Sequence, residues 1–118
     1  MHEIAITQDV VNVVVKYAEA NDASQVLSVK LRVGAMRDIV DEWMQRFFDF
    51  LSRGTIAEGA KLEIQRTPIV FHCECGRFFA TSLAEIIADQ KVPCPSCKSE
   101  NTRLYSGREF DIVSIGVV

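Results

Sequence analysis

The sequence of 118 residues lacks features that several protein classes require. Its most apolar stretch, "VVNVVV" at residues 10–15, is far too short to span a bilayer. At the start of the sequence, no basic segment leads into a continuous apolar core, so no signal peptide is expected. These two absences predict a soluble, cytoplasmic protein with no membrane partner.

Basic runs are absent as well. The 13 Lys and Arg residues are scattered among 16 Asp and Glu residues, and the net charge is −3. A protein that binds the phosphate backbone needs a concentrated basic face, so no nucleic acid is expected as a partner. The sequence also shows no paired nucleophile and base and no phosphate-binding loop, so we do not expect an enzyme.

Two segments have the periodicity of amphipathic helices. The first covers Ile4 to Ala20, and the second lies within residues 38–54. In the second we expect Asp38 or Asp41 as the N-cap and Gly54 just past the end. Its apolar stripe is predicted to consist of Val40, Trp43, Phe47 and Leu51, and Trp43, Phe47, Phe48 and Phe50 are all expected to pack in the core.

Three segments alternate between apolar and polar residues as strands do: 26–34 ("VLSVKLRVG"), 61–66 ("KLEIQR") and 109–118 ("EFDIVSIGVV"). A strand, a helix and a second strand in succession predict a right-handed crossover and a parallel strand pair. The expected fold is therefore α+β, with two helices packed on a small three-stranded mixed sheet.

All four cysteines, Cys73, Cys75, Cys94 and Cys97, fall between the second and third strands. In a reducing compartment, two short turns that each present two thiolates predict a tetrahedral zinc site rather than disulfides. The first pair has one intervening residue instead of the usual two, whereas His72 and Cys75 do have that spacing. Four cysteines are the preferred ligand set, and His72 with the last three cysteines stays open. We expect an inserted zinc-ribbon-like domain over residues 69–105, with residues 1–68 and 106–118 forming the other domain.

The first three residues offer a second set of metal ligands. The α-amine of Met1, the amide nitrogen and imidazole of His2, and the amide or carboxylate of Glu3 could chelate one metal ion. A nitrogen-rich set of this kind suits Ni(II) or Cu(II).

The sequence resembles the HypA family of nickel-incorporation proteins. The resemblance rests on "MHE", "LRVG", "RGTIAEGAKLEI", the two cysteine pairs and "SGREFDIVSIGVV", in that order over essentially the whole chain. It implies a nickel metallochaperone with a structural Zn²⁺ site and a nickel-binding α/β domain that carries Ni²⁺ as transient cargo on Met1, His2 and Glu3. The implied partners are a nickel-handling, HypB-like GTPase and the precursor of the [NiFe]-hydrogenase large subunit. Some members of the family also serve urease, and a homodimer stays open.

The shortened first cysteine pair departs from the family pattern, because Cys75-Gly76 aligns with the second family cysteine and leaves His72 at the place of the first. A Cys-x-Cys followed by Cys-x-x-Cys is also similar to the zinc-gated switch of a family of redox-regulated chaperones. The alternative functions are therefore a zinc-dependent thiol redox sensor and a zinc-ribbon interaction module.

Overall fold

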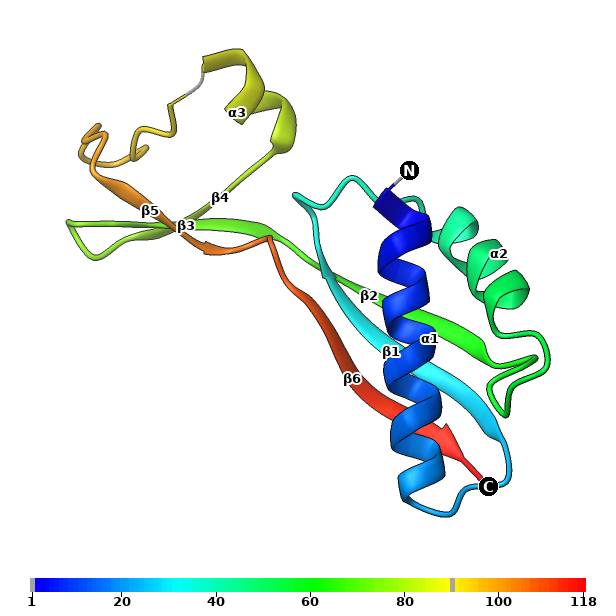
Figure 1. Ribbon diagram of the computed structural model, residues 1–118. Coiled ribbons are helices and arrows are strands. Elements are labelled where there is room, and N and C mark those ends of the chain that lie inside the picture. The colour runs from blue at the N-terminus through cyan, green and yellow to red at the C-terminus, as the bar shows by residue number, and fades with distance from the viewer. Residues whose placement is uncertain (1, 90) are drawn as a thin grey trace. The chain divides into compact units, whose positions relative to one another are not determined.

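The computed structural model describes residues 2–89 and 91–118, and for His2, Glu3 and residues 87–89 it describes the backbone alone. These residues form three helices and two three-stranded sheets, which confirms the predicted α+β class (Figure 1). The elements are α1 (His2–Ala20), β1 (Val26–Gly34), α2 (Asp41–Leu51), β2 (Lys61–Thr67), β3 (Ile69–Cys73), β4 (Phe78–Thr81), α3 (Leu83–Asp89), β5 (Thr102–Ser106) and β6 (Phe110–Val117).

The chain divides into two compact units. The first unit consists of Met1–Arg32, Ile39–Gln65 and Asp111–Val118, and the second of Val33–Asp38 and Arg66–Phe110. The division therefore falls within β1, β2 and β6. Among the described residues, no helix is long and apolar enough to cross a membrane.

The first sheet has the strand order β2-β1-β6. The N–H of Val26, at the start of β1, donates to the carbonyl of Ile56 ahead of β2. The N–H of Ala35, just after β1, donates to Thr67 at the end of β2. The two strands thus begin together and end together, which confirms the predicted parallel pair.

On its other side β1 is antiparallel to β6. The N–H of Gly34, at the end of β1, donates to the carbonyl of Glu109 just before β6, over 2.7 Å. At the opposite end, the N–H of Val118 donates to Gln25 over 3.0 Å. The sheet is therefore mixed, as predicted.

Helix α1 and strand β1 supply most of the core of the first unit. The helix buries Thr7, Val10, Val11, Val14 and Ala18, which recur at the helical period. In β1 the alternation places three side chains in the core and leaves Lys30 and Arg32 outside. Those three are Val29 and Leu31 of the first unit and Val33, with which the second unit begins, and they form the apolar face of the predicted alternation.

The predicted apolar stripe of α2 was wrong by one residue. Met44 and Phe48 are fully buried, whereas Trp43 is 51% exposed and Phe50 is 63% exposed. Apolar residues cover more than one face of this short helix, so the helical period alone could not choose which face would dock. Arginine side chains lie over the exposed rings of α2. The guanidinium of Arg46, for example, lies 5.9 Å from the ring centroid of Trp43.

The expected N-cap of α2 was wrong as well. The N-cap is Val40, in extended conformation, and it makes no side-chain capping bond, so neither Asp38 nor Asp41 caps the helix. Asp41 instead begins the helix, and its charge lies in the first turn together with Glu42. Carboxylates there are stabilised by the unpaired N–H groups and the helix dipole, which is the physical substitute for a cap.

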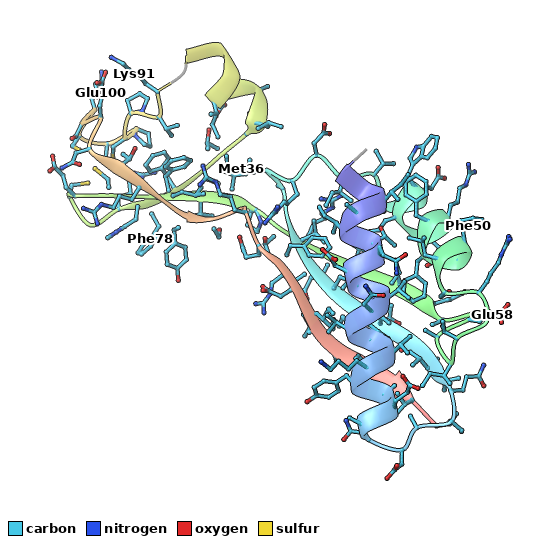
Figure 2. All side chains as sticks on the ribbon, in the orientation of Figure 1. Met36, Phe50, Glu58, Phe78, Lys91 and Glu100 are labelled. Carbon is cyan, nitrogen blue, oxygen red and sulfur yellow. The ribbon has the colours of Figure 1, made fainter. Side chains whose placement is uncertain are left out.

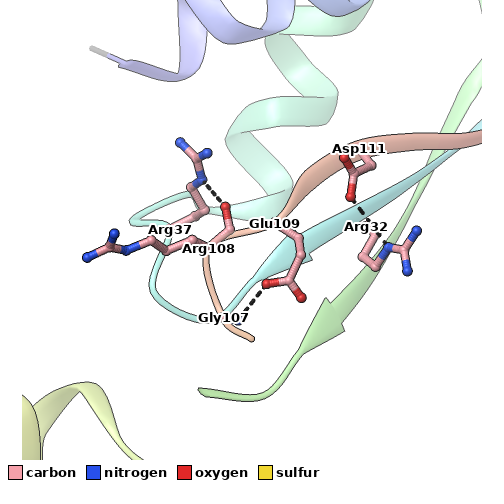
Figure 3. Close-up of polar contacts among 6 residues, drawn as sticks. All are labelled: Arg32, Arg37, Gly107, Arg108, Glu109 and Asp111. Carbon is pink, nitrogen blue, oxygen red and sulfur yellow. Dashed lines mark hydrogen bonds and ion pairs between the residues drawn. The ribbon is translucent and has the colours of Figure 1, made fainter. Parts of the chain in front are cut away.

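Hydrogen bonds join the segment after β1 to the segment before β6, and one further bond lies within the latter segment. The N–H of Met36 donates to the carbonyl of Gly107 over 2.8 Å. The guanidinium Nε of Arg37 donates to the carbonyl of Arg108 over 2.9 Å, and the N–H of Gly107 donates to the carboxylate of Glu109 (Figure 3). Figure 3 also shows the ion pair between Arg32 on β1 and Asp111 on β6.

The second sheet, which the sequence patterns did not predict, has the order β4-β3-β5, and both pairings are antiparallel. Strands β3, β4 and β5 have only four or five residues each, too few to show a clear alternation. Helix α3 follows β4 and begins with a capping box: the N–H of Glu85 donates to the hydroxyl of Ser82, and the carboxylate of Glu85 accepts from the N–H of Ser82.

Candidate metal centre

The four cysteines of the second unit converge on one point. Their sulfur atoms all lie within 4.8 Å of one another. The sulfur of Cys73 is 3.4 Å from that of Cys97, and the sulfur of Cys75 is 3.8 Å from that of Cys94. Each close contact thus joins one turn to the other. Cys73 and Cys94 are buried, whereas Cys75 and Cys97 are exposed.

Two similar turns carry these sulfurs, one at Cys73 and Cys75 and one at Cys94 and Cys97. After Cys75, the N–H of Gly76 donates to the carbonyl of Cys73, and after Cys97 the N–H of Lys98 donates to the carbonyl of Cys94, both over 2.9 Å. Both donors have positive φ, 95° at Gly76 and 61° at Lys98. This left-handed conformation curls each turn back so that both of its sulfurs face the same side. Glycine adopts it without strain at position 76.

Different backbone N–H groups influence the two buried thiols. Those of Cys97 and Ser96 favour the thiolate of Cys94, and that of Cys75 favours the thiolate of Cys73. For Cys94 the N–H groups outweigh burial and lower the pKa of the thiol to about 6. For Cys73 the N–H of Cys75 lowers the pKa, but burial and the three other thiols outweigh it and raise the pKa to about 12.

These opposite shifts reflect how costly several thiolates are at such short range. The pair of N–H donors stabilises charge on Cys94, and the proton stays on Cys73. A divalent cation among the sulfurs would deprotonate all four, because a coordinated thiol loses its proton.

His72 lies apart from the sulfur group. Its side chain is exposed, and its ring stacks on that of Phe78 with 4.3 Å between centroids. The two residues are directly paired across β3 and β4, which brings their rings together. Phe78, labelled on β4 in Figure 2, also meets the ring of Tyr105 edge-on at 4.9 Å. The structure thus brings the four cysteines together without His72, which belongs to an exposed cluster of three rings.

Polar side chains connect the two cysteine turns directly. Glu74, between the first two cysteines, accepts hydrogen bonds from Ser99 and Asn101. Arg77 donates to the hydroxyl of Ser96, which lies between the last two. Nearby, Lys91 and Glu100 form an ion pair of 3.4 Å (Figure 2). These connections were not predicted from the sequence. The one signal for them in the sequence was Glu74, a charged residue between two cysteines.

The residues of the predicted nickel site lie at the edge of what the structure describes. Met1 is outside the described residues, and so are the side chains of His2 and Glu3. The backbone of His2 and Glu3 forms the start of α1. The first N–H groups of an α-helix have no partner within the helix.

The donor set of the sulfur group fits zinc. Zinc binds thiolate sulfur at about 2.3 Å in a tetrahedron, which places the sulfurs about 3.8 Å apart. The contacts of 3.4 Å and 3.8 Å between the turns are close to that edge length. Four soft donors on two turns of a small three-stranded unit define a metal-binding protein with a zinc-ribbon-like site.

Comparison with known proteins identifies the family. Residues 1–117 match the sequence model of the family described as "Hydrogenase/urease nickel incorporation, metallochaperone, hypA". The hydrogenase maturation factor HypA of Dehalococcoides mccartyi strain 195 is 34% identical over 118 residues, 99% of this chain and 94% of that protein. That of Methanothermobacter thermautotrophicus is 32% identical over 120 residues, 99% of this chain and 97% of that protein. The chain therefore belongs to the HypA family of nickel metallochaperones of hydrogenase maturation.

Solved structures show the same fold. The solution structure titled "Solution structure of HypA protein" has a TM-score of 0.74 and 19% identity, and the alignment covers 100% of this chain and 97% of that one. The nickel metallochaperone HypA of Helicobacter pylori has a TM-score of 0.65 and 16% identity, covering 98% and 97%.

Proposed function

We propose that this chain binds Ni(II) at its N-terminus and delivers it during the maturation of [NiFe]-hydrogenase, while a structural Zn²⁺ is held by Cys73, Cys75, Cys94 and Cys97. The observation that carries the proposal is the family match, which runs from the first residue through both cysteine pairs. In this proposal residues 1–68 and 106–118 serve nickel, and residues 69–105 serve zinc.

The proposed nickel ligands are the α-amine of Met1, the amide nitrogen and imidazole of His2, and an amide or carboxylate group of Glu3. The position at the start of α1 supports this assignment, because the first amides of a helix are not engaged in its hydrogen bonds. A site of nitrogen donors without thiolate releases its metal more readily than a four-cysteine cage. That property suits a carrier rather than an enzyme.

Nickel binding to this ligand set depends on pH. His2, the α-amine and a coordinating amide nitrogen must lose protons when they bind, so nickel affinity should rise with pH.

The ligand set does not by itself select nickel. By the Irving–Williams order, Cu(II) should bind more tightly than Ni(II), so metal supply and partners would decide which metal is delivered.

The proposed partners are a HypB-like GTPase and the precursor of the hydrogenase large subunit, which would meet the carrier in the cytoplasm. A urease precursor is a further proposed recipient, since the family description includes urease. The proposed zinc site would hold the turns of the second unit in the shape that a partner contacts.

A nickel titration of tag-free protein tests the proposal. His2→Ala, and separately a short tag fused ahead of Met1, should each abolish Ni(II) binding while one zinc per chain remains. His72→Ala is the matched control, because it removes the other histidine of the chain, which is exposed. Unchanged nickel affinity in both N-terminal variants would contradict the proposed site.

A further inference from the structure

The spacer of one residue makes the first cysteine turn shorter than the second. In the second turn, the N–H of Lys98 reaches back four residues to Cys94; in the first, the N–H of Gly76 reaches back three residues to Cys73. Each turn has one further backbone bond of 2.9 Å, from the N–H of Cys73 to the carbonyl of Arg77 in the first turn and from the N–H of Cys94 to the carbonyl of Ser99 in the second. These bonds close each turn on itself, and a side-chain contact is needed to hold one turn against the other.

Glu74, the single spacer residue, makes such a contact. Its Oε1 accepts from the hydroxyl of Ser99 over 2.9 Å, and its Oε2 accepts from the side-chain amide of Asn101 over 2.6 Å. Both carboxylate oxygens are thus engaged by residues that are 25 and 27 positions away in the sequence. A carboxylate held by two donors fixes an orientation as well as a position.

The two donors are themselves fixed to the second turn. The carbonyl of Ser99 accepts from the N–H of Cys94 over 2.9 Å, which closes that turn. The N–H of Asn101 donates to the hydroxyl of Ser99 over 3.1 Å, and the carbonyl of Asn101 accepts from the N–H of Glu74. The contact therefore runs continuously from the spacer of the first turn to the backbone of Cys94.

We propose that Glu74 is a positioning residue of the metal site, which holds the Cys73–Cys75 turn against Ser99 and Asn101 so that the four sulfurs converge before metal binds. The proposal rests on the zinc site proposed above and assigns Glu74 no role as a ligand. Residues that orient metal ligands from outside typically contribute a factor of about 10–100 in metal affinity.

An alternative role for Glu74 predicts the opposite effect. A carboxylate beside a four-thiolate zinc site adds negative charge to a site that is already anionic, and its removal should then tighten zinc binding. The sign of the change in affinity on removing Glu74 therefore separates positioning from charge repulsion.

The test compares Glu74→Ala, Asn101→Ala and the double variant with wild type in the full chain. Zinc affinity is measured by competition with a chromophoric chelator, and Co(II) absorption reports the number of thiolates and the symmetry of the site. We expect each single variant to bind zinc about 10–100-fold more weakly and to transfer it faster to the chelator, and the double variant to be little worse than either. The cobalt-thiolate charge-transfer intensity should still report four sulfurs, while the d–d bands shift.

Two further variants make the result specific. Glu100→Ala removes a carboxylate at the position between Ser99 and Asn101. Glu100 pairs with Lys91, so this variant should leave the zinc affinity and the cobalt bands unchanged. Glu74→Gln keeps the side-chain volume, and it replaces Glu74→Ala if that variant does not fold. Because it keeps one acceptor oxygen, it should lose part of the affinity.

Zinc affinity that is unchanged or tighter in both Glu74 and Asn101 variants would overturn the positioning role, and so would strictly additive losses in the double variant. If wild type itself gave no four-thiolate cobalt spectrum, the zinc site would be wrong, and the role of Glu74 with it. The wild-type spectrum thus distinguishes the two failures.

Discussion

Gly34 and Gly107 are in backbone contact where β1 ends and the chain approaches β6. A Cβ built on Gly34 would lie 2.0 Å from the carbonyl oxygen of Gly107 and 2.5 Å from the backbone nitrogen of Arg108. The same carbonyl accepts from the N–H of Met36, and the N–H of Gly34 donates to Glu109, so neither segment can move away without losing these bonds. The glycine of "LRVG" is therefore required by packing, and the glycine of "SGRE" has a φ of 127°, which other residues rarely adopt.

Gly34→Ala should destabilise the protein strongly. Because the clash is with backbone rather than a flexible side chain, the loss should reach or exceed the upper end of the about 1–3 kcal/mol usual for overpacking. Gly54→Ala is the matched control: its φ is +77°, but nothing lies within 4 Å of the added Cβ. It should cost about 1–2 kcal/mol through backbone strain alone. Urea unfolding of the two variants gives both values, and equal losses would contradict the role of the contact.

Helix α2 offers a second pair of matched substitutions. Phe48 is fully buried and Phe50 is 63% exposed, although they are two residues apart on one helix. Phe48→Ala should lower the free energy of unfolding by about 3–5 kcal/mol, since it leaves a cavity. Phe50→Ala should change it by no more than about 0.5 kcal/mol. Thermal or urea unfolding measures both, and a larger loss for Phe50→Ala would mean that the helix docks by its other face.

The contrast on α2 also shows what could be predicted from the sequence. The alternation of β1 identified its buried face, because Lys30 and Arg32 lie opposite the buried residues. Helix α1 was less clear, because Val13 and Tyr17 are apolar and exposed while Thr7 is buried. In α2, Trp43, Met44, Phe47 and Phe48 form two adjacent apolar stripes, and tertiary packing selected one. The parallel pairing of β1 with β2 followed from the order of elements and the handedness of crossovers, whereas the place of β6 beside β1 was not predicted.

In the second unit, the metal site could be predicted from the cysteines, but the three strands could not be predicted from the sequence pattern. The spacing of Cys94 and Cys97 pointed to a metal turn, and the sulfurs do converge. The contacts of Glu74 could not be inferred, because Ser99 and Asn101 lie at least 25 residues away along the chain. Local patterns carry no information on which distant polar groups will meet.

Glu109 should make the stability depend on pH in the acid range. Burial raises the pKa of its carboxyl, but the N–H of Gly107 and nearby backbone N–H groups outweigh burial, so the pKa is lowered from its ordinary value of 4.5. The unfolded chain then takes up a proton at higher pH than the folded one. The stabilisation is present above about pH 4.5 and is lost as the pH falls through the lowered, folded-state pKa.

Glu109→Gln measures this contribution. The variant should be less stable than wild type at pH 6, and the difference between the two should shrink as the pH is lowered to about 3. Urea unfolding at a series of pH values gives the two curves. A difference that stays constant with pH would show that the carboxylate charge of Glu109 does not stabilise the folded state.

The last prediction concerns which residues bind zinc. His72 is the sequence alternative to Cys73, but its ring stacks on Phe78 and is exposed, whereas the sulfur of Cys73 lies 3.4 Å from that of Cys97. His72→Ala should therefore leave one zinc per chain and an unchanged four-thiolate cobalt spectrum, and Cys73→Ser should remove one thiolate from that spectrum and weaken zinc binding. Moving His72 onto the metal would break its stacking on Phe78 and its place in the β3–β4 pairing. If instead His72→Ala lost zinc and Cys73→Ser kept it, the first turn would bind metal through His72 and Cys75, the two residues with the usual spacing.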